Sequence, residues 1–496
     1  MSHGVRFARN VGWSLAGQGA VVAINIVLIP RLVHGFGVEA YGLYLLMQSA
    51  AGWVGALHFG AGAGLLRYAS QFQAEGKRGA LDDSLRHSAL MVIGGAVLGA
   101  LVLGCAAPAL VERVFVVPGY YRSHGTWMIR AAALGAVFAA ITSWSAAAFQ
   151  GLHCFQWQSA AAVLQGIFIP LGVLCALTAG RGLGAAAAAF VAVHAFVALF
   201  CLFGLQRVRR TVPDHGGRQS FHDFWRYSIG FWPHGLAQMV SGQLDRVFVA
   251  GLRSMSEFTL YAVPASVLSR VQSLPATASV ALIPVLGGLG EQESRETDVR
   301  MYLRASRTLL GIIIPVYALL FCLMPQFLSL WLGGNFGDTS VWPARLLVFT
   351  QTAALFSAMP ISVVAGRKGG WWLSASSWLQ AIVCLALWPW MIPRWGLIGA
   401  ALGGLIAQTL STTLFVSAVH SYLLDLTGER FMRETLIPTS AGVAALLIVV
   451  WPLRVRVTGW VSFFALCVAA GACYAIVFWR LLPADDRRFL RARLPF

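Results

Sequence analysis

Apolar runs of membrane-spanning length recur from one end of the chain to the other, separated by short polar segments. A helix needs about 20 mostly apolar residues to cross the hydrocarbon core of a bilayer. This pattern predicts an all-α polytopic membrane protein with about fourteen transmembrane helices. The predicted spans are residues 11–33, 40–66, 87–111, 126–149, 157–179, 183–206, 226–250, 258–286, 304–332, 341–366, 370–392, 396–421, 435–453 and 458–480.

The N-terminal segment MSHGVRFARN is basic and precedes an apolar stretch, as in a secretory signal peptide. That stretch runs for about 23 residues and lacks the small-residue cleavage pattern of a signal peptide. We therefore expect it to be retained as the first span.

The distribution of basic residues predicts the orientation. If both termini are cytoplasmic, the inside segments hold 24 of the 36 Lys and Arg residues, in keeping with the positive-inside bias. Several Trp residues fall at predicted span ends, as in an interfacial belt: Trp331, Trp342, Trp388, Trp390, Trp395, Trp451 and Trp460. The longest outside loop, near residues 112–125, leaves no room for an extracytoplasmic enzyme domain.

The predicted spans divide into two groups of six followed by two more. The polar segment 207–225 contains Pro and Gly-Gly and follows the sixth span, so it is the expected linker. The predicted parts are residues 1–206, 207–225, 226–425 and 426–496, the last comprising two further helices and a basic cytoplasmic tail. An internal repeat supports this division, because adding 220 to each number converts Ser14, Gln18, Asn25 and Tyr41 into His234, Gln238, Asp245 and Tyr261. Transporters are often built from such paired repeats.

Composition agrees with a membrane protein and argues against binding of nucleic acid. The chain is 58% apolar and 11% charged, whereas a soluble domain has about 25% charged residues. Its net charge of +17 is carried mainly by Arg in short loops, for which anionic membrane lipids are the expected partner. The eight Cys residues lie in or beside apolar runs without a CxxC motif, so neither a disulfide framework nor a metal site is expected.

One acidic residue, Asp245 in SGQLDRVFVAG, lies well inside a predicted span, which costs about 2.5–3.5 kcal/mol on insertion scales. His234, Gln238, Ser241 and Asp245 are spaced by 4, 3 and 4 residues and so share one helix face. Such a face points to protein or to a water-filled cavity. Asp245, with His234 and Ser241 as further ligands or a proton relay, is therefore a candidate site for a cation or a proton.

Cationic and polar groups occur on other spans. A second polar face in the eighth span contains Ser266, Ser269, Arg270, Ser273 and Thr277, between kink-forming Pro264 and Pro275. Arg31 lies in the outer part of the first span, and Arg67 lies at the inner end of the second. Because Arg binds phosphate oxygens bidentately, these residues favour a phosphate-bearing substrate.

The same residues also have structural interpretations, which the sequence leaves open. Asp245 and Arg246 or Arg270 are candidates for an ion pair that holds two helices together. Arg31, Arg67 and Arg246 are also candidates for side chains that extend to the membrane surface. The segment FGAGAGLL (59–66) lacks the preceding strand of a phosphate-binding loop, so its small residues favour close helix packing. His58 and His194 are expected to be hydrogen-bonded core residues, and the chain has no Walker A motif.

Two segments resemble a known family. Residues 8–70 contain an early Asn, a long span ending in IPRLV, then FGVEAYGLY and a Gly-rich segment leading to LLRY. The second segment reads LDRVFVAGLRSMSEFTLYAV (244–263). Together with the layout of about fourteen spans, these segments resemble the Wzx-type polysaccharide flippases of the MOP exporter superfamily.

The resemblance implies two pseudo-symmetric six-helix lobes and two C-terminal helices, with a cationic cavity between the lobes. It implies alternating access that moves an undecaprenyl-pyrophosphate-linked oligosaccharide across the bacterial cytoplasmic (inner) membrane for O-antigen or exopolysaccharide biosynthesis. A polysaccharide polymerase and glycosyltransferases of the same pathway would be partners. No cofactor is implied beyond coupling to H⁺ or Na⁺.

By analogy with this family, the cavity residues that contact pyrophosphate or acidic sugars would be Arg31, Arg67 and Arg270, with Gln18, Asn25 and Gln238 as further candidates. Asp245 would couple transport to an ion. The cavity lysines described for the family are absent, so which Arg replaces them is open.

Three other functions fit less well. An ion-coupled multidrug or metabolite antiporter of the same superfamily should have several acidic cavity residues, whereas one intramembrane acid stands here among several Arg. A major-facilitator transporter does not account for the last two spans. A membrane polymerase or ligase needs a large outer loop to hold two glycans, so we predict that the protein is not an enzyme.

Overall fold

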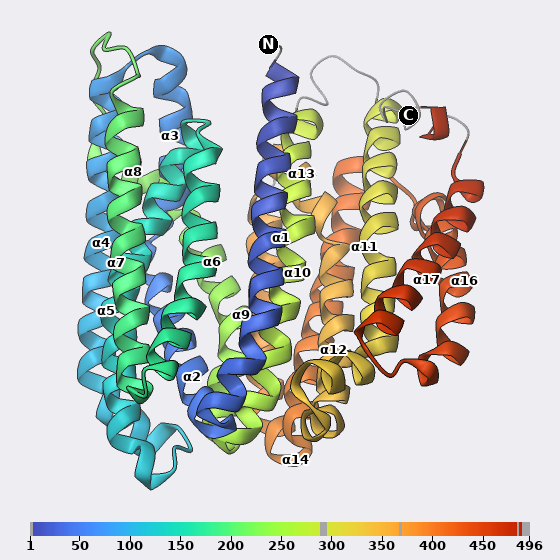
Figure 1. Cartoon of the computed structure of the whole chain (residues 1–496). Coiled ribbons are helices and arrows are strands. Elements are labelled where there is room, and N and C mark those ends of the chain that lie inside the picture. The colour runs from blue at the N-terminus through green and yellow to red at the C-terminus, as the bar shows by residue number, and fades with distance from the viewer. Residues whose placement is uncertain (1–2, 288–294, 367–369, 484–485, 489–496) are drawn as a thin grey trace. The chain divides into compact units, whose positions relative to one another are not determined.

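The protein is described by a computed structural model over residues 3–287, 295–366, 370–483 and 486–488, and these residues form helices joined by short turns (Figure 1). Among the described residues, one isolated β-bridge joins Lys77 to Asp214. Ten helical segments of the described chain are long and apolar enough to cross a membrane. The predicted all-α polytopic fold is confirmed.

The chain forms two compact units, Met1–Ala262 and Val263–Phe496. The domain boundaries expected from the sequence, at residues 206, 225 and 425, stay a prediction. Each unit is considered separately below.

The first unit is a helical bundle in which α5 packs against α4 and α7, and α6 packs against α1 and α7 (Figure 1). Its helices are α1 (His3–Phe36), α2 (Val38–Val54), η1 (Gly55–His58), α3 (Ala61–Glu75), α4 (Arg78–Ala109), η2 (Leu110–Val114), η3 (Gly119–Tyr121), α5 (Arg122–Gly151), α6 (Phe155–Thr178), α7 (Gly182–Arg209), α8 (Phe221–Ile229), α9 (Trp232–Leu252) and the start of α10 (Met255–Gly287). Leu65, Leu81, Phe149 and Phe224 belong to its buried core.

Small residues allow close contact between these helices. A Cβ atom at Gly166 of α6 would lie 2.4 Å from Val21 of α1, and one at Gly135 of α5 would lie 2.6 Å from the Phe190 ring of α7. In lipid, where hydrophobic burial does not favour helix association, such packing is a main source of stability.

Two predicted spans of the first unit are broken into shorter helices. The span 40–66 is built from α2, η1 and α3, because Phe59 (φ 51°) and Gly60 (φ 72°) adopt left-handed backbone conformations that end one helix before the next begins. The span 226–250 is built from part of α8 and from α9, with the break near Gly230 and Phe231.

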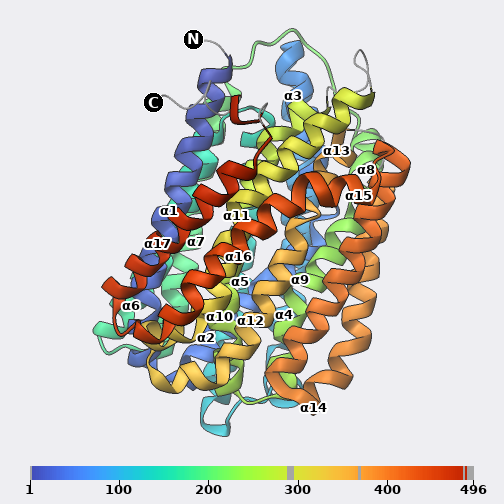
Figure 2. The same cartoon turned by 90° about the vertical axis from the view of Figure 1, so that its right-hand side faces the viewer.

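The second unit contains the rest of α10 and the remaining helices. They are α11 (Arg295–Leu332), α12 (Gly334–Leu355), α13 (Ala358–Gly366), α14 (Gly370–Ala418), η4 (Val419–Leu424), α15 (Gly428–Phe431), η5 (Met432–Leu436), α16 (Ile437–Leu453), η6 (Arg454–Arg456) and α17 (Trp460–Leu481). The 49 residues of α14 would span about 74 Å as a straight helix, against a hydrocarbon core of about 30 Å. Gly396 (φ 58°, ψ −134°) breaks α14 into two arms, which correspond to two predicted spans (Figure 2).

The last two helices pack on each other and on α11 (Figure 2). Their shared core includes Leu323 of α11, Leu446 of α16 and Leu466 of α17. The Tyr474 hydroxyl of α17 donates a hydrogen bond of 2.6 Å to the Gly311 carbonyl of α11. These contacts make the C-terminal pair an integral part of the second unit.

Ion pairs join three segments of the second unit that were predicted to lie on the inside. Arg307 of α11 pairs with Asp486, and the Arg304 guanidinium lies 2.6 Å from the same carboxylate. Arg430 pairs with Glu296 at 2.8 Å. At one end of the unit, therefore, the start of α11 meets the region of α15 and the residues after α17. This agrees with the predicted topology, in which an even number of spans separates each of these segments from the next.

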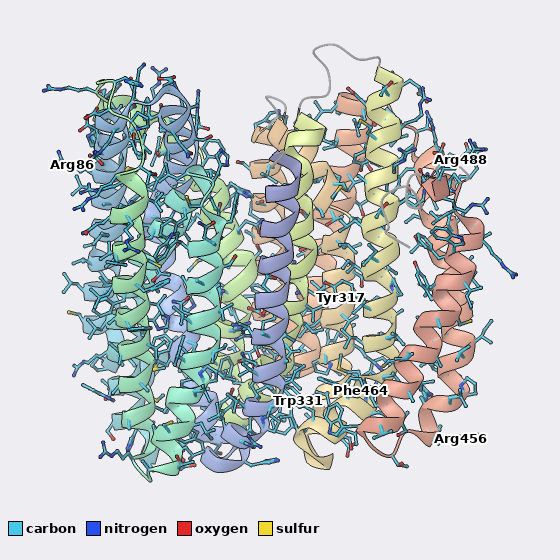
Figure 3. All side chains as sticks on the ribbon, turned by 45° about the horizontal axis from the view of Figure 1, so that its top comes forward. Arg86, Tyr317, Trp331, Arg456, Phe464 and Arg488 are labelled. Atoms are coloured by element: carbon cyan, nitrogen blue, oxygen red, sulfur yellow. The ribbon has the colours of Figure 1, made fainter. Side chains whose placement is uncertain are left out.

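Tryptophan positions partly fit the predicted belt. Trp342, Trp390, Trp395, Trp451 and Trp460 are exposed, but Trp331 and Trp388 are buried. Trp388 was misassigned because its indole N–H donates to the Ala400 carbonyl across the bend of α14. Figure 3 shows Trp331 and Phe464 toward the end of the second unit that lies opposite Arg488.

Candidate functional site

The central feature of the first unit is the carboxylate of Asp245 on α9. The Tyr261 hydroxyl of α10 donates a hydrogen bond of 2.9 Å to Asp245 Oδ2. Asp245 Oδ1 is buried and has no hydrogen-bond partner in the described chain, and the same holds for Nε of Arg246. Neighbouring residues on a helix point about 100° apart, and the hydrogen bond of Asp245 goes to Tyr261, with no ion pair to Arg246 within 4.0 Å in the described residues.

The other residues of the predicted α9 face differ in their surroundings. Ser241 Oγ donates to the Ala237 carbonyl at 3.0 Å, so its hydroxyl is bound within its own helix. Gln238 is exposed and His234 is half-buried. The three residues lie along one face of α9 with Asp245, as predicted, and their roles as ligands stay predictions.

The three candidate residues on α1 differ in how far they are buried. Asn25 is buried, and its amide donates to Val21 O at 2.8 Å and to Gly166 O at 3.1 Å. This side chain ties α1 to α6, which gives its position a structural explanation. Gln18 is half-buried and Arg31 is exposed.

Arg67 of α3 is exposed, and its guanidinium carbon lies 4.4 Å from the centroid of the Tyr227 ring on α8. The ring of Tyr68 is 5.7 Å from the same atom. In the described chain no carboxylate lies within 4.0 Å of Arg67. A guanidinium stacked on an aromatic face keeps its edge N–H groups available for a bidentate anion.

Arg270 is half-buried on α10 in the second unit. Two serines of its predicted polar face bond within the helix, Ser266 Oγ to Val263 O at 2.7 Å and Ser269 Oγ to Ser266 O at 2.8 Å. The side chains of Ser273 and Thr277 lie outside the described residues.

The Gly-rich segment serves helix packing, as its sequence favoured. A Cβ atom at Gly60 would lie 2.0 Å from the Ser228 carbonyl oxygen, and one at Gly64 would lie 2.2 Å from Ser228 Oγ. His58 Nδ1 accepts the Gly60 N–H at 3.0 Å, and His194 Nδ1 lies 2.8 Å from the Phe190 carbonyl. Both histidines are hydrogen-bonded, as predicted, and His194 is buried in the core, whereas His58 is half-buried.

Sequence reasoning missed two aromatic partners. Tyr227 is the residue on which Arg67 stacks, and no pattern in the sequence pointed to it. Tyr261 already stood in the internal repeat with Asp245, so the spacing of 16 residues was an available signal for their contact. In the described chain, no group of three or more His, Cys, Asp and Glu side chains is arranged to hold a metal ion.

The chain matches a family model described as polysaccharide biosynthesis protein over residues 7–289, more than half of its length. The chain belongs to this family. No curated protein matches the chain. The resemblance seen in residues 8–70 and 244–263 is thereby confirmed.

Solved structures share the fold. The chain is similar to an inward-facing multidrug resistance MATE family transporter of the MOP superfamily, with 15% identity, a TM-score of 0.64 and coverage of 83% of this chain and 99% of that one. It is also similar to the lipid II flippase MurJ in an inward closed conformation, with 12% identity, a TM-score of 0.65 and coverage of 94% and 98%. A MOP superfamily transporter from Pyrococcus furiosus has 14% identity, a TM-score of 0.56 and coverage of 85% and 96%. Family and fold together support a multi-pass membrane flippase or exporter rather than an enzyme.

Proposed function

We propose that this polysaccharide biosynthesis protein is a flippase for an undecaprenyl-pyrophosphate-linked oligosaccharide in the bacterial cytoplasmic membrane. The observation that carries the proposal is the family match over residues 7–289. Transport of the lipid-linked intermediate to the outer leaflet would supply surface polysaccharide synthesis, O-antigen or exopolysaccharide. A polymerase and glycosyltransferases would act on either side of this step.

The chemistry of Arg67 supports a phosphate-bearing substrate. Its exposed guanidinium is positioned by the Tyr227 ring and has no carboxylate within 4.0 Å in the described residues. A positioned guanidinium binds two phosphate oxygens at once, which a Lys ammonium does not reproduce. Arg67, with Arg31 and Arg270, is the proposed contact to the pyrophosphate, and Gln18, Asn25 and Gln238 are proposed cavity residues.

Asp245 is the proposed ion-coupling residue. Tyr261 holds one carboxylate oxygen, while the other is buried without a protein hydrogen-bond partner in the described chain. Buried polar atoms are normally satisfied, so a proton or a Na⁺ ion on Oδ1 would complete the carboxylate in one state of the cycle. His234 and Ser241 are the proposed neighbours in this exchange. Alternating access would then be driven by an ion gradient.

The proposed orientation has both termini in the cytoplasm. In the first unit, the α3–α4 turn and the segment after α7 are joined by backbone hydrogen bonds, as required if both lie on the same side. In the second unit, the ion pairs of Asp486 and Glu296 join three predicted inside segments. The basic residues of these segments favour the cytoplasmic side.

The alternative is an ion-coupled multidrug or metabolite antiporter. The structural likeness to a multidrug resistance MATE transporter favours it, although an identity of 15% shows the fold alone. A cationic drug would need acidic partners, whereas Asp245 is the one acid well inside a predicted span.

A deletion strain separates the two functions. We expect loss of surface polysaccharide and accumulation of the lipid-linked oligosaccharide, both restored by the wild-type gene and by Arg207→Ala but not by Arg67→Ala. Arg207 is the matched control because it is also an exposed Arg stacked on an aromatic ring, that of Phe203 at 5.2 Å. Normal surface polysaccharide together with increased sensitivity to cationic drugs would contradict the flippase and favour the antiporter.

A further inference from the structure

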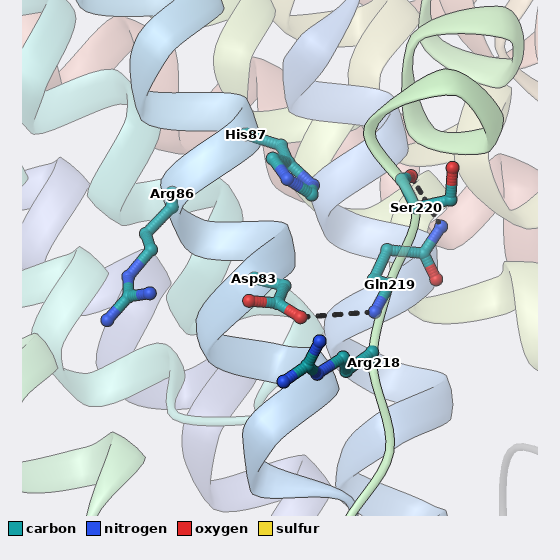
Figure 4. A pocket seen from close by; sticks show the side chains of 6 residues that line it. All are labelled: Asp83, Arg86, His87, Arg218, Gln219 and Ser220. Carbon is teal, nitrogen blue, oxygen red and sulfur yellow. Dashed lines mark hydrogen bonds between the residues drawn. The ribbon is translucent and has the colours of Figure 1, made fainter.

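The first unit contains a cavity of about 630 Å³ at the end where α4 begins (Figure 4). One wall comes from the first turns of α4 and the other from the segment that joins α7 to α8. The lining residues are Asp83, Arg86, His87, Arg218, Gln219 and Ser220.

Backbone contacts hold the connecting segment against the α3–α4 turn. Arg78 N–H donates to the Pro213 carbonyl at 3.2 Å, and His215 N–H donates to the Gly76 carbonyl at 2.9 Å. Gly76 has a positive φ of 65°, and a Cβ atom there would lie 2.6 Å from the His215 ring. The wall that carries Arg218 is therefore fixed to the bundle.

The lining carries an excess of positive charge. Arg86 and Arg218 are exposed, and neither has a carboxylate within 4.0 Å in the described residues. Asp83 is the one carboxylate of the lining, and its Oδ2 accepts the Gln219 N–H at 3.2 Å. Figure 4 shows Arg86 and Arg218 on different sides of Asp83. Two guanidinium groups against one carboxylate leave a site suited to an anion.

Further donors lie at the same place. His87 Nδ1 is a buried nitrogen without a hydrogen-bond partner in the described chain. Helix α8 begins directly after Ser220, and no side chain caps its first N–H groups. Uncapped N–H groups and the positive end of the helix dipole favour a bound anion.

Next to the cavity, α8 exposes two aromatic side chains on one face. Phe221 and Trp225 are 42% and 38% exposed, and their ring centroids are 6.1 Å apart. Phe224 of the same helix is fully buried in the bundle. Exposed aromatic residues on an amphipathic helix favour the membrane–water interface.

We propose that this cavity binds the phosphate-bearing headgroup of an anionic lipid at the membrane surface. The two arginines would contact the phosphate, and the aromatic pair of α8 would lie beside the acyl chains. A free phosphate anion offers the same charge chemistry but does not use Phe221 and Trp225. The site is independent of the substrate proposed above.

Native mass spectrometry of the purified full chain, titrated with phosphatidylglycerol and with phosphatidylcholine, tests the site. We expect preference for phosphatidylglycerol, and a loss of its affinity by about tenfold in Arg86→Gln/Arg218→Gln. The control Arg207→Gln/Arg210→Gln removes the same charge from exposed positions outside the lining and should change the affinity by less than about twofold.

Three results would overturn the proposal. The first is equal phosphatidylglycerol affinity in the two double variants, and the second is equal binding of the two lipids by the wild type. The third is binding of glycerol 1-phosphate as tight as that of phosphatidylglycerol, which would assign the cavity to a soluble anion. Because all four changed residues are exposed, unchanged thermal unfolding of both variants is expected and confirms that the comparison is between folded proteins.

Discussion

The Tyr261 hydroxyl donates a hydrogen bond of 2.9 Å to Asp245 Oδ2 and so joins the start of α10 to α9. The bond fixes one oxygen of the one acid that lies well inside a predicted span. The other oxygen is buried without a partner in the described chain. A carboxylate held in this way is oriented by one neighbour and still able to exchange a proton or a cation.

Asp245→Asn tests this role. The variant keeps an acceptor for Tyr261 but cannot change its charge, so we expect normal insertion and substrate binding with loss of the dependence of transport on the pH or sodium gradient. The measurement is transport in proteoliposomes with an imposed gradient. Unchanged gradient dependence would mean that Asp245 does not couple transport.

Tyr261→Phe is the matched control, because it removes the hydrogen bond that orients Asp245 and keeps the carboxylate. Removing a hydrogen bond to a charged group costs about 1.5–3 kcal/mol, so we expect lower thermal stability with gradient dependence retained. If Asp245 instead served to pair with Arg246, Asp245→Asn would lower stability and adding Arg246→Gln would restore it. We expect no such rescue, since the hydrogen bond of the Asp245 carboxylate goes to Tyr261 and no ion pair within 4.0 Å joins it to Arg246 in the described residues.

Arg270 is predicted to contact the phosphate of the substrate. Arg270→Ala should abolish glycan export at normal expression, and Arg270→Lys should be partly active because an ammonium group does not form the bidentate contact. Surface polysaccharide, measured by gel analysis of cell extracts, provides the readout. Wild-type amounts in the Ala variant would remove Arg270 from the site.

The ion pair between Arg307 and Asp486 should stabilise the second unit. Both residues are buried, and removal of one partner from a buried pair costs about 3–5 kcal/mol when the other charge is left alone; the cost here is smaller because Arg304 stays beside Asp486. We expect a clear drop in the thermal unfolding temperature of Arg307→Ala in detergent. Arg300→Ala, at an exposed pair with Glu296, should cost less than about 1 kcal/mol. Equal effects of the two changes would show that burial does not govern the contribution of these pairs.

Single cysteines test the orientation in a background without the eight native cysteines. Arg218→Cys and Arg488→Cys are exposed positions predicted to be cytoplasmic, so membrane-impermeant reagents should not label them in intact cells. Arg181→Cys, exposed in the α6–α7 turn and predicted outside, should be labelled. Labelling of Arg218→Cys or Arg488→Cys from outside would reject the orientation.

The sequence was sufficient for the helical layout because the length of an apolar run determines a membrane span. Each predicted span is mostly helical in the structure, and the Gly396 bend separates the two predicted arms of α14. The internal breaks were not predicted, since a left-handed Phe59 has no signature in hydropathy. Trp388 was wrongly assigned to the membrane interface because its contact with Ala400 depends on the Gly396 bend, which hydropathy does not reveal.

Side-chain partners were harder to predict than helices. Asn25 bonds to Gly166, 141 residues away, and Arg67 stacks on Tyr227 of another helix. Such pairs follow from how helices pack, which neither periodicity nor composition encodes. The contact of Asp245 with Tyr261 is local enough for the internal repeat to have marked both residues.

Reconstituted transport tests the central proposal most directly. Proteoliposomes that contain the protein and a fluorescent undecaprenyl-pyrophosphate-linked oligosaccharide report translocation as the glycan becomes accessible to an external glycosidase. We expect protein-dependent translocation by the wild type and by Arg207→Ala, and strong loss in Arg67→Ala. Absence of translocation by folded wild-type protein under an imposed gradient, or full activity of Arg67→Ala, would contradict the account.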